Sequence, residues 1–426
     1  MGTLASTGVP SASIAVVKDG RIAYLRTYGE ARFEPPTPAR PEMRYAIGSI
    51  SKQFTAVALL LLQEQGKLSL DDPVGKYFPN LTRAYQVTVR QLLSHTSGYQ
   101  DFWPQDYVMP MMLKPTTVEK IMDTWGRKPL DYEPGTRWQY SNTGYTIAGA
   151  IIEKITRKPY FQFIRENIFT PLNMTSVVDF DQQKLGPNDS AGYMRYGIGP
   201  ARVAPDAGPG WTSAAFELCM TAEDLAKWDI ALLDHKIMNA ASYRQFESEA
   251  VLINGLGTQY GLGVFVRSDS GHRVLSHGGE VSGFTATNNV YPDDNVAVVV
   301  LTNQDAASAS GDIAKKIGAL ALQDSDTARQ LEQARQIFNM LQHGNINRTW
   351  FTDNANSYFS EQALEDFASS LGPLGDPKEF KQTNQALRGG MVLRVYEAKF
   401  PERSLRVWTF GMPDGKLEQY QIAASD

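Results

Sequence analysis

Residues 49–66 read SISKQFTAVALLLLQEQG, and this stretch decides how the rest of the chain is interpreted. Its apolar residues follow the spacing of a helix, and Gly66 stands where a helix commonly stops. Ser49 and Lys52 are three residues apart, so a helix places the hydroxyl and the amine on one face. A serine is a weak nucleophile unless a neighbouring base takes its proton, and a helix N-terminus favours developing negative charge. The pattern therefore predicts a nucleophile and its base.

The simpler interpretation of the same residues is a helix cap followed by a solvated lysine. Two observations count against it. This is the only SxxK in the chain, and Lys52 precedes a strongly apolar run that predicts a buried helix.

A second candidate group is Tyr140-Ser141-Asn142, the only YxN in the chain, within EPGTRWQYSNTGYT. On an extended segment, residues two apart point the same way. Tyr140 is then able to relay a proton while Asn142 holds a substrate carbonyl or Lys52. The alternative is a buried tyrosine whose hydroxyl finds a partner in the loop.

The third group is His277-Gly278-Gly279, followed by Glu280, at the end of HRVLSHGG. Glycines let a substrate backbone approach a strand edge, and the next N–H group can join that of Ser49 in an oxyanion hole. The alternative is a strand that ends in a glycine turn, with His277 as a satisfied polar side chain.

The order of elements predicts an α/β (α+β) fold in which an antiparallel sheet is flanked by helices and interrupted by a large helical insertion. Two β-rich runs flank Asp19-Gly20, a tight hairpin signal, and strands return near Gly261. A second hairpin is expected at Asp293-Asp294, and DIAKKIGALAL follows as a helix. We expect one domain over 1–325, with sheet parts at 1–48 and 256–325 and the helical region at 49–255.

Residues 326–426 predict a separate, small α+β domain. Two polar helical runs are followed by MVLRVYEAKF, SLRVWTFGMP and KLEQYQIA, which we interpret as three strands around an MPDG turn. By the order of its elements this domain is similar to those of the nuclear-transport-factor-2 (NTF2) type.

Composition limits the classes of function. The formal net charge of the 426 residues is −5, and no cluster of Lys and Arg predicts a nucleic-acid partner. The longest aliphatic run, 56–62, is too short for a membrane span. Cys219 is the only cysteine, and the five histidines show no metal-ligand spacing, so we expect neither a metal nor another cofactor.

The N-terminus leaves the location of the protein open. A strand is expected almost at once, so the sequence reads as a mature or trimmed chain, with Met1-Gly2 as a cloning remnant. The protein is periplasmic or secreted if a signal peptide has been removed, and cytoplasmic otherwise. Its oligomeric state is not predicted.

The three groups, in this order, resemble the class C β-lactamases and their relatives: low-molecular-weight D,D-peptidases, D-aminopeptidases and esterases of β-lactamase fold. The surrounding segments YAIGSISKQFTA, LLSHTSGY, PGTRWQYSNTGY and SHGGEVSGF are similar to that family too, and the resemblance runs from about Gly8 to Asn303. No GxSxG elbow suggests a classical α/β-hydrolase.

The resemblance implies an acyl-enzyme on Ser49. It also implies that Lys52 is the proton acceptor or a member of its network, and that Tyr140 protonates the leaving group. Asn142 would contact the substrate amide. The oxyanion strand would be formed by Gly278, Gly279 and the N–H of Glu280, and His95 would be a structural residue. We therefore expect a serine hydrolase that acts on a small-molecule or peptide substrate: small amides, D-amino-acid peptides or esters. A true β-lactamase and a non-catalytic protein that binds peptides or cell-wall ligands are the alternatives.

Three departures from the family pattern are visible. His277 stands where β-lactamases commonly carry a lysine, so we expect weak β-lactam turnover, improved toward pH 6 if the imidazole titrates near about 6.5. The segment 207–228, AGPGWTSAAFELCMTAEDLAKW, follows the family's glycine-rich text only loosely. The usual leading helix is largely missing.

Overall fold

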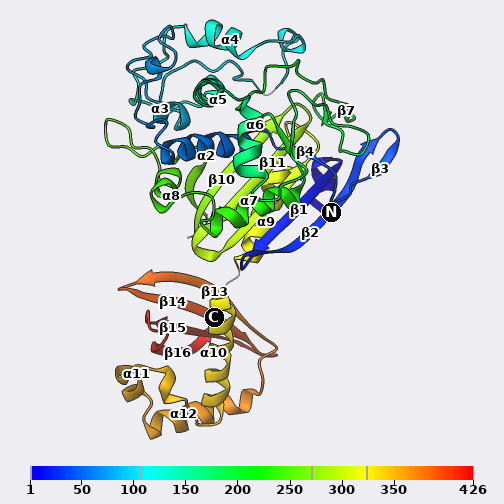
Figure 1. Cartoon of the computed structure of the whole chain (residues 1–426). Coiled ribbons are helices and arrows are strands. Elements are labelled where there is room, and N and C mark those ends of the chain that lie inside the picture. Colours follow the sequence, from blue (N-terminus) through cyan, green and yellow to red (C-terminus); the bar gives the residue numbers. More distant parts are fainter. Residues whose placement is uncertain (1, 106, 270–271, 323–324, 426) are drawn as a thin grey trace. The chain divides into compact units, whose positions relative to one another are not determined.

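A computed structural model describes residues 2–105, 107–269, 272–322 and 325–425 (Figure 1). The chain divides into two compact units, Met1–Leu322 and Gln323–Asp426, close to the boundary expected after residue 325. Met1 lies outside the described residues. A six-residue helix, α1 (Gly2–Thr7), precedes the first strand.

The larger unit is built on a seven-stranded sheet with the order β3-β2-β1-β12-β11-β10-β9. All the pairings are antiparallel, and β1 pairs with β12, which brings the two ends of the unit together. The predicted antiparallel sheet with a helical insertion is thus confirmed. The strands are β1 (Ser11–Lys18), β2 (Arg21–Phe33), β3 (Pro36–Pro38), β9 (Phe265–Asp269), β10 (His272–Val281), β11 (Phe284–Tyr291) and β12 (Val296–Thr302).

Both expected hairpins are present. Asp19 and Gly20 have φ angles of 52° and 72°, and the register closes at Lys18↔Arg21. These left-handed conformations suit Asp and Gly, which is why this dipeptide turns the chain. The second hairpin passes through the 3₁₀ turn Pro292–Asp294.

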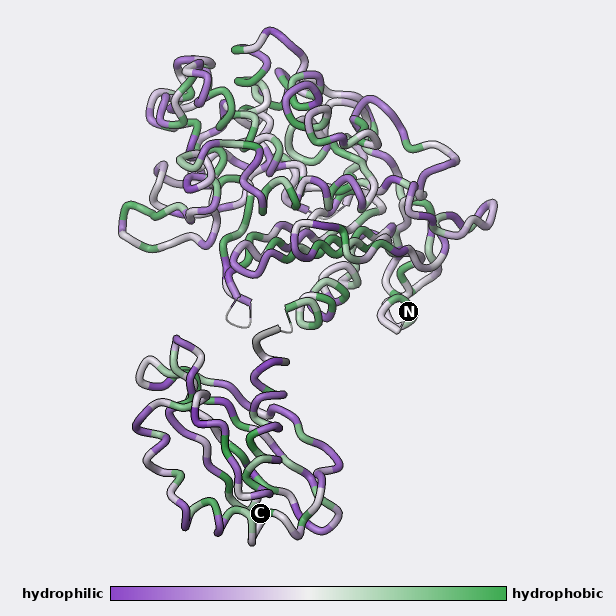
Figure 2. The backbone as a smooth tube through the Cα atoms, turned by 60° about the horizontal axis from the view of Figure 1, so that its bottom comes forward, coloured by the Kyte–Doolittle hydropathy of each residue, from purple (hydrophilic) through white to green (hydrophobic). Residues whose placement is uncertain are grey.

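Strand β12 forms the centre of the core. All seven of its residues are buried, and successive side chains point to opposite faces of the sheet. One face packs with α1 and α9 (Ala309–Ala321), and the other faces the main core of the unit. Figure 2 shows the resulting hydrophobic band through the interior of the larger unit.

The helical region covers the second face of the sheet. Its helices are α2 (Ser51–Glu64), α3 (Val89–Leu93), α4 (Val118–Ile121), α5 (Asn142–Thr156), α6 (Tyr160–Ile164), α7 (Ala222–Leu233) and α8 (Ala240–Phe246). Within this region and just before it lie short strands that the sequence did not predict. They are β4 (Tyr45–Ala46), β5 (Val178–Asp179) and β8 (Leu218–Met220) in one sheet, and β6 (Tyr193–Met194) with β7 (Arg202–Val203) in another.

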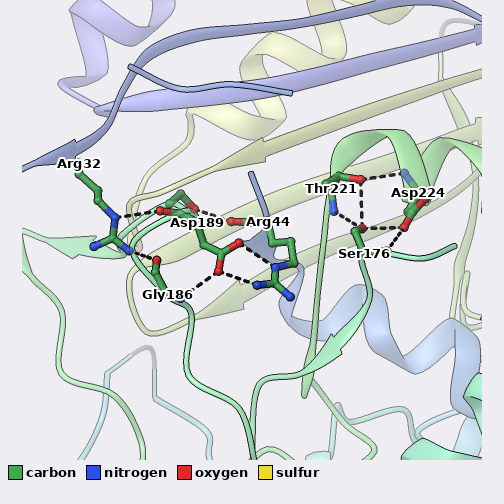
Figure 3. Close-up of polar contacts among 8 residues, drawn as sticks. Arg32, Arg44, Ser176, Gly186, Asp189, Thr221 and Asp224 are labelled. Atoms are coloured by element: carbon green, nitrogen blue, oxygen red, sulfur yellow. Dashed lines mark hydrogen bonds and ion pairs between the residues drawn. The ribbon is translucent and has the colours of Figure 1, made fainter. Parts of the chain in front are cut away.

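Partly buried polar contacts hold the loop that links these short strands (Figure 3). Arg44 makes a bidentate contact with Asp189, at 2.7 and 2.8 Å, while Arg32 donates to the backbone carbonyl of Asp189. Asp224 accepts from both the backbone and the hydroxyl of Ser176. Paired charge-assisted bonds of this kind fix geometry, so β8 is held beside β4 and the chain that leads into α2.

The smaller unit is a four-stranded antiparallel sheet with its own hydrophobic core. Its helices are α10 (Ser325–Gln342), α11 (Asp353–Tyr358) and α12 (Glu361–Leu371), and its strands are β13 (Glu379–Arg388), β14 (Met391–Lys399), β15 (Ser404–Gly411) and β16 (Leu417–Ser425). The expectation of three strands was wrong. Strand β13, EFKQTNQALR, is a largely exposed edge strand, so it lacks the apolar alternation that marks the other three. Among the described residues of both units, no helix is long and apolar enough to span a bilayer.

Candidate active site

Ser49 lies in a 3₁₀ turn, Gly48–Ile50, immediately before α2. The helix begins at Ser51, two residues later than its pattern suggested, and Ile50 is the N-cap with no side-chain capping bond. The capping interpretation of Ser49 is therefore wrong. The hydroxyl is presented at the start of a fully buried helix face instead.

Lys52 is completely buried, and its amine has three neighbours. The Nζ atom lies 2.9 Å from Ser49 Oγ, 2.8 Å from Asn142 Oδ1 and 3.0 Å from the Ala215 carbonyl oxygen. The last two atoms can only accept hydrogen bonds, whereas a hydroxyl can donate or accept. A neutral amine has two N–H groups and one lone pair, so the lone pair faces Ser49.

The electrostatics of the site favour this neutral amine. Burial lowers the pKa of Lys52 well below its usual range, and the nearby carboxylate of Asp101 only partly opposes that shift. Burial also raises the pKa of Tyr140, and Asp101 raises it further, so the phenol keeps its proton at neutral pH. Lys52 is thus suited to accept a proton and Tyr140 to donate one.

Tyr140 and Asn142 both reach Lys52, although not along one extended segment. Ser141 is extended and caps α5, and Asn142 is already the first residue of that helix. The Tyr140 hydroxyl is hydrogen-bonded to Ser49, and its ring centroid is 4.8 Å from Lys52 Nζ. The structure therefore brings together all four of these predicted residues, Ser49, Lys52, Tyr140 and Asn142.

Asp101 is a site residue that the sequence did not reveal. Its carboxylate accepts from the Asn142 backbone N–H at 3.0 Å and from the Asn142 side-chain amide at 3.3 Å. These contacts turn the amide oxygen of Asn142 toward Lys52. Asp101 stands two residues after the segment LLSHTSGY. No sequence spacing relates it to the three candidate groups.

His95 supports the tyrosine loop, in line with the structural role expected for it. It is buried in the left-handed conformation, and its Nδ1 accepts from the Ser141 backbone N–H at 3.1 Å. Its ring lies 4.2 Å from that of Tyr140, centroid to centroid. The loop that carries Tyr140 is thereby held against α5.

His277 lies within β10, which continues to Val281, so the alternative of a strand that ends in a glycine turn is wrong. The imidazole is buried, with Nε2 at 3.0 Å from the Tyr260 hydroxyl and Nδ1 at 2.6 Å from the Gly278 carbonyl. Burial and nearby Lys52 lower the pKa of His277 to about 3. The imidazole therefore stays neutral at pH 6, and the gain for carboxylate substrates that the sequence predicted at that pH is not expected.

Glycines allow β10 to pack directly on the turn that carries Ser49. A Cβ atom at Gly279 would lie 1.9 Å from the Ile47 carbonyl oxygen, and one at Gly48 would lie 2.6 Å from the Glu280 nitrogen. Gly48 also has a φ of 51°, a conformation that favours glycine. This contact brings the backbone N–H groups of Ser49 and Glu280 into one region.

A cavity of about 930 Å³ opens at this point. Strand β9 pairs with β10 only as far as Ser276, and the following residues, 277–282, form one wall. The other walls come from Ser49, Asp101, 103–105, 107–108, 139–140, Asn142, Phe216, Phe265, 285–287, 307–308 and 310–312. Among the described residues of this lining, the charged side chains are the acids Asp101, Glu280 and Asp312. No cationic side chain belongs to this described lining; Arg267 stacks behind it, 3.9 Å from the ring centroid of Phe265.

No group of three His, Cys, Asp or Glu side chains within the described ranges is arranged to hold a metal ion. The groups gathered around Ser49 are its own hydroxyl, the Lys52 amine, the Tyr140 phenol and the Asn142 amide. They can perform nucleophilic and acid–base chemistry on a carbonyl group.

Known proteins share this architecture. Protein flp of Staphylococcus aureus (strain MRSA252) is 28% identical over 305 residues, which are 69% of this chain and 60% of that protein's length. A D-stereospecific amidohydrolase from Streptomyces sp. superposes with a TM-score of 0.65 at 29% identity, covering 74% of this chain and 94% of that one. The octameric penicillin-binding protein homologue from Pyrococcus abyssi, at 23% identity, shares the fold with a TM-score of 0.67 and covers 100% of this chain and 94% of its own.

The family comparison agrees with the geometry. The family model described as Beta-lactamase matches residues 2–323, which is most of the chain and contains every site residue named above. This chain belongs to the β-lactamase family.

Proposed function

We propose that this protein is a serine hydrolase that forms an acyl-enzyme on Ser49. The observation that carries the proposal is the buried amine of Lys52, held 2.9 Å from Ser49 Oγ by two fixed acceptors. A neutral lysine in that position accepts the hydroxyl proton as the oxygen attacks a carbonyl carbon.

The remaining groups complete the cycle. The N–H groups of Ser49 and Glu280 stabilise the oxyanion of the tetrahedral intermediate. As the bond to the leaving group breaks, the Tyr140 hydroxyl donates a proton to that group and recovers one from the Lys52 ammonium. A water molecule then attacks the ester on Ser49, loses its proton to the same network and releases the acid.

The cavity favours substrates without a carboxylate. His277 is neutral, and the charged groups of the described lining are acidic, so a β-lactam or peptide carboxylate finds no fixed cation there. Amides, esters and short peptides that are recognised through a free amino terminus depend less on such a cation. The similarity to a D-stereospecific amidohydrolase supports an amide of this kind.

Two alternatives remain in view. A true β-lactamase needs efficient capture of a carboxylate, which the lining disfavours. A non-catalytic binder has no use for a buried lysine, an oriented amide and a phenol directed at one hydroxyl.

Intact-mass spectrometry tests these possibilities together. The protein is incubated with a β-lactam, a fluorophosphonate and a D-amino-acid amide, and peptide mapping locates any adduct. We expect Ser49 to be modified by the fluorophosphonate and the amide to be turned over. An unmodified Ser49 in a folded protein supports the binder, and rapid β-lactam turnover supports the β-lactamase.

The substitution His277→Lys is expected to shift preference toward carboxylate substrates. It should raise kcat/KM for a penicillin relative to a neutral ester by about tenfold at pH 7, because it adds the missing cation. The wild-type ratio should stay flat between pH 7 and pH 6, because the imidazole does not titrate there. A ratio that rises as the pH falls through 6 would contradict a neutral His277.

The smaller unit is expected to be dispensable for the chemistry. All the site residues lie before Leu322, and each unit has its own hydrophobic core. A chain that ends at Leu322 should therefore acylate with an activated ester at a rate within about threefold of the full-length protein. A soluble, folded truncation that fails to acylate would show that the smaller unit is needed.

A further inference from the structure

The segment after Pro209 is only loosely similar in sequence to the family pattern. It contributes to the active site through its backbone. The Ala215 carbonyl accepts a hydrogen bond from Lys52, and Phe216 lines the cavity. The next residue, Glu217, is only 3% exposed and has no part in the proposed chemistry. Burying a carboxyl group costs free energy, so a buried carboxyl two residues from Ala215, whose carbonyl accepts from Lys52, requires an explanation.

The side chain of Glu217 folds back on this segment. Its Oε2 accepts from the Ala214 backbone N–H at 2.9 Å, while Oε1 is buried without a hydrogen-bond partner among the described residues. Ala214 has a φ of 58°, which is strained for alanine, and its carbonyl accepts from the Thr55 hydroxyl at 2.6 Å. The carboxyl group and α2 therefore hold the strained residue from two sides.

We infer that Glu217 is a positioning residue: its carboxyl group holds the turn at Ala214 so that the Ala215 carbonyl stays directed at Lys52. This inference rests on the proposed function of Lys52 as the base. With the Ala215 carbonyl and Asn142 occupying both N–H groups, the lysine lone pair is kept on Ser49. Loss of either acceptor frees the amine to rotate away from the hydroxyl.

The surroundings of Glu217 favour its neutral form. Burial raises its pKa well above the usual range, and the nearby carboxyl of Asp179 raises it further. The other titratable groups that face it are Asp181 after β5, Glu153 of α5 and Tyr160 of α6. Each of them disfavours a negative charge on Glu217 when it is itself ionised.

Ionisation of Glu217 works against the base. As the pH rises through its raised pKa, a carboxylate appears beside the peptide that contacts Lys52. A negative charge buried there, close to Asp179 and Asp181, disfavours the turn at Ala214, so the Ala215 carbonyl is no longer held on Lys52. The acylation rate should therefore decline on the alkaline side, in addition to its decline in acid.

The test compares Glu217→Gln with Glu217→Ala in the full-length chain, using the acylation burst with p-nitrophenyl acetate from pH 5 to pH 10. Glutamine keeps the acceptor for the Ala214 N–H and cannot ionise, so its rate at pH 7 should be within about twofold of wild type, and its alkaline decline should disappear. Alanine removes the acceptor and should lower the acylation rate constant about tenfold or more, with little change in KM.

A matched control is Asp229→Asn, which changes another fully buried carboxyl, one bonded to Asn288. It should keep the alkaline decline.

Titration of labelled Lys52 by NMR supplies a readout that does not depend on turnover. Glu217→Ala is expected to lower the pKa of Lys52 further, because one hydrogen-bond acceptor of the ammonium is lost, whereas Glu217→Gln should leave it unchanged at neutral pH. An unaltered Lys52 titration in Glu217→Ala overturns the inference. So does an alkaline decline that persists in Glu217→Gln, a result that decides the matter even if the alanine variant fails to fold. Absence of any Ser49 acylation in the wild type would instead refute the proposed function.

Discussion

Replacing Ser49 with alanine is expected to lower hydrolysis by about 10³-fold or more and to abolish acylation of the chain. The oxygen that attacks the carbonyl is lost, and neither Lys52 nor Tyr140 can form the ester in its place. The fold should persist, because Ser49 makes no capping bond and its hydroxyl is hydrogen-bonded to Lys52 and Tyr140 of the catalytic network. Intact mass after incubation with a fluorophosphonate, together with a thermal unfolding curve, measures both effects.

Ser51→Ala provides the matched control two residues away. Its buried hydroxyl accepts from the Leu218 backbone N–H at 3.2 Å, so its removal leaves that donor unsatisfied. The free energy of unfolding should fall by about 1–3 kcal/mol, while Ser49 still acylates. Hydrolysis by Ser49→Ala at the wild-type rate would rule out an acyl-enzyme on this residue.

The second large effect is expected at Lys52. Lys52→Met keeps most of the side-chain volume and removes the amine, and it should slow acylation by about 10³-fold. Tyr140→Phe should also be severely impaired. The double variant should be little worse than either single one, because the groups act as a unit.

The pH dependence of the wild-type rate separates the two candidate bases. The pKa of Lys52 lies well below the ordinary lysine range. The acylation rate should therefore fall only when the pH drops below this lowered pKa and the amine becomes protonated. If NMR instead shows Lys52 titrating near its usual value, Tyr140 must be the base. That outcome requires a phenolate, which burial of Tyr140 opposes.

Local patterns predicted most of the secondary structure that carries the site. The apolar spacing of 49–66 predicted α2, and the Asp19-Gly20 turn predicted the hairpin of β1 and β2. These signals are local: helix periodicity and left-handed turns depend on neighbours in sequence. The start of α2 was misplaced by two residues because the preceding 3₁₀ turn has no sequence signature.

Contacts between distant segments were harder to predict. Strand β13 was missed because it is polar and exposed at the edge of its sheet. Asp101 was missed because its function depends on reaching Asn142 across 41 positions. The Ala215 carbonyl has no side-chain signal at all, since any residue offers the same backbone oxygen.

The sequence by itself determined the fold class, the order of the motifs and the family to which this chain belongs. Each of these depends on residue type and spacing alone. The tertiary structure decided the states of the groups: the neutral amine of Lys52, the imidazole of His277 that does not titrate near neutral pH, and the buried carboxyl of Glu217. Those states depend on removal of water and on which partners approach from other segments, and only the packed fold sets both.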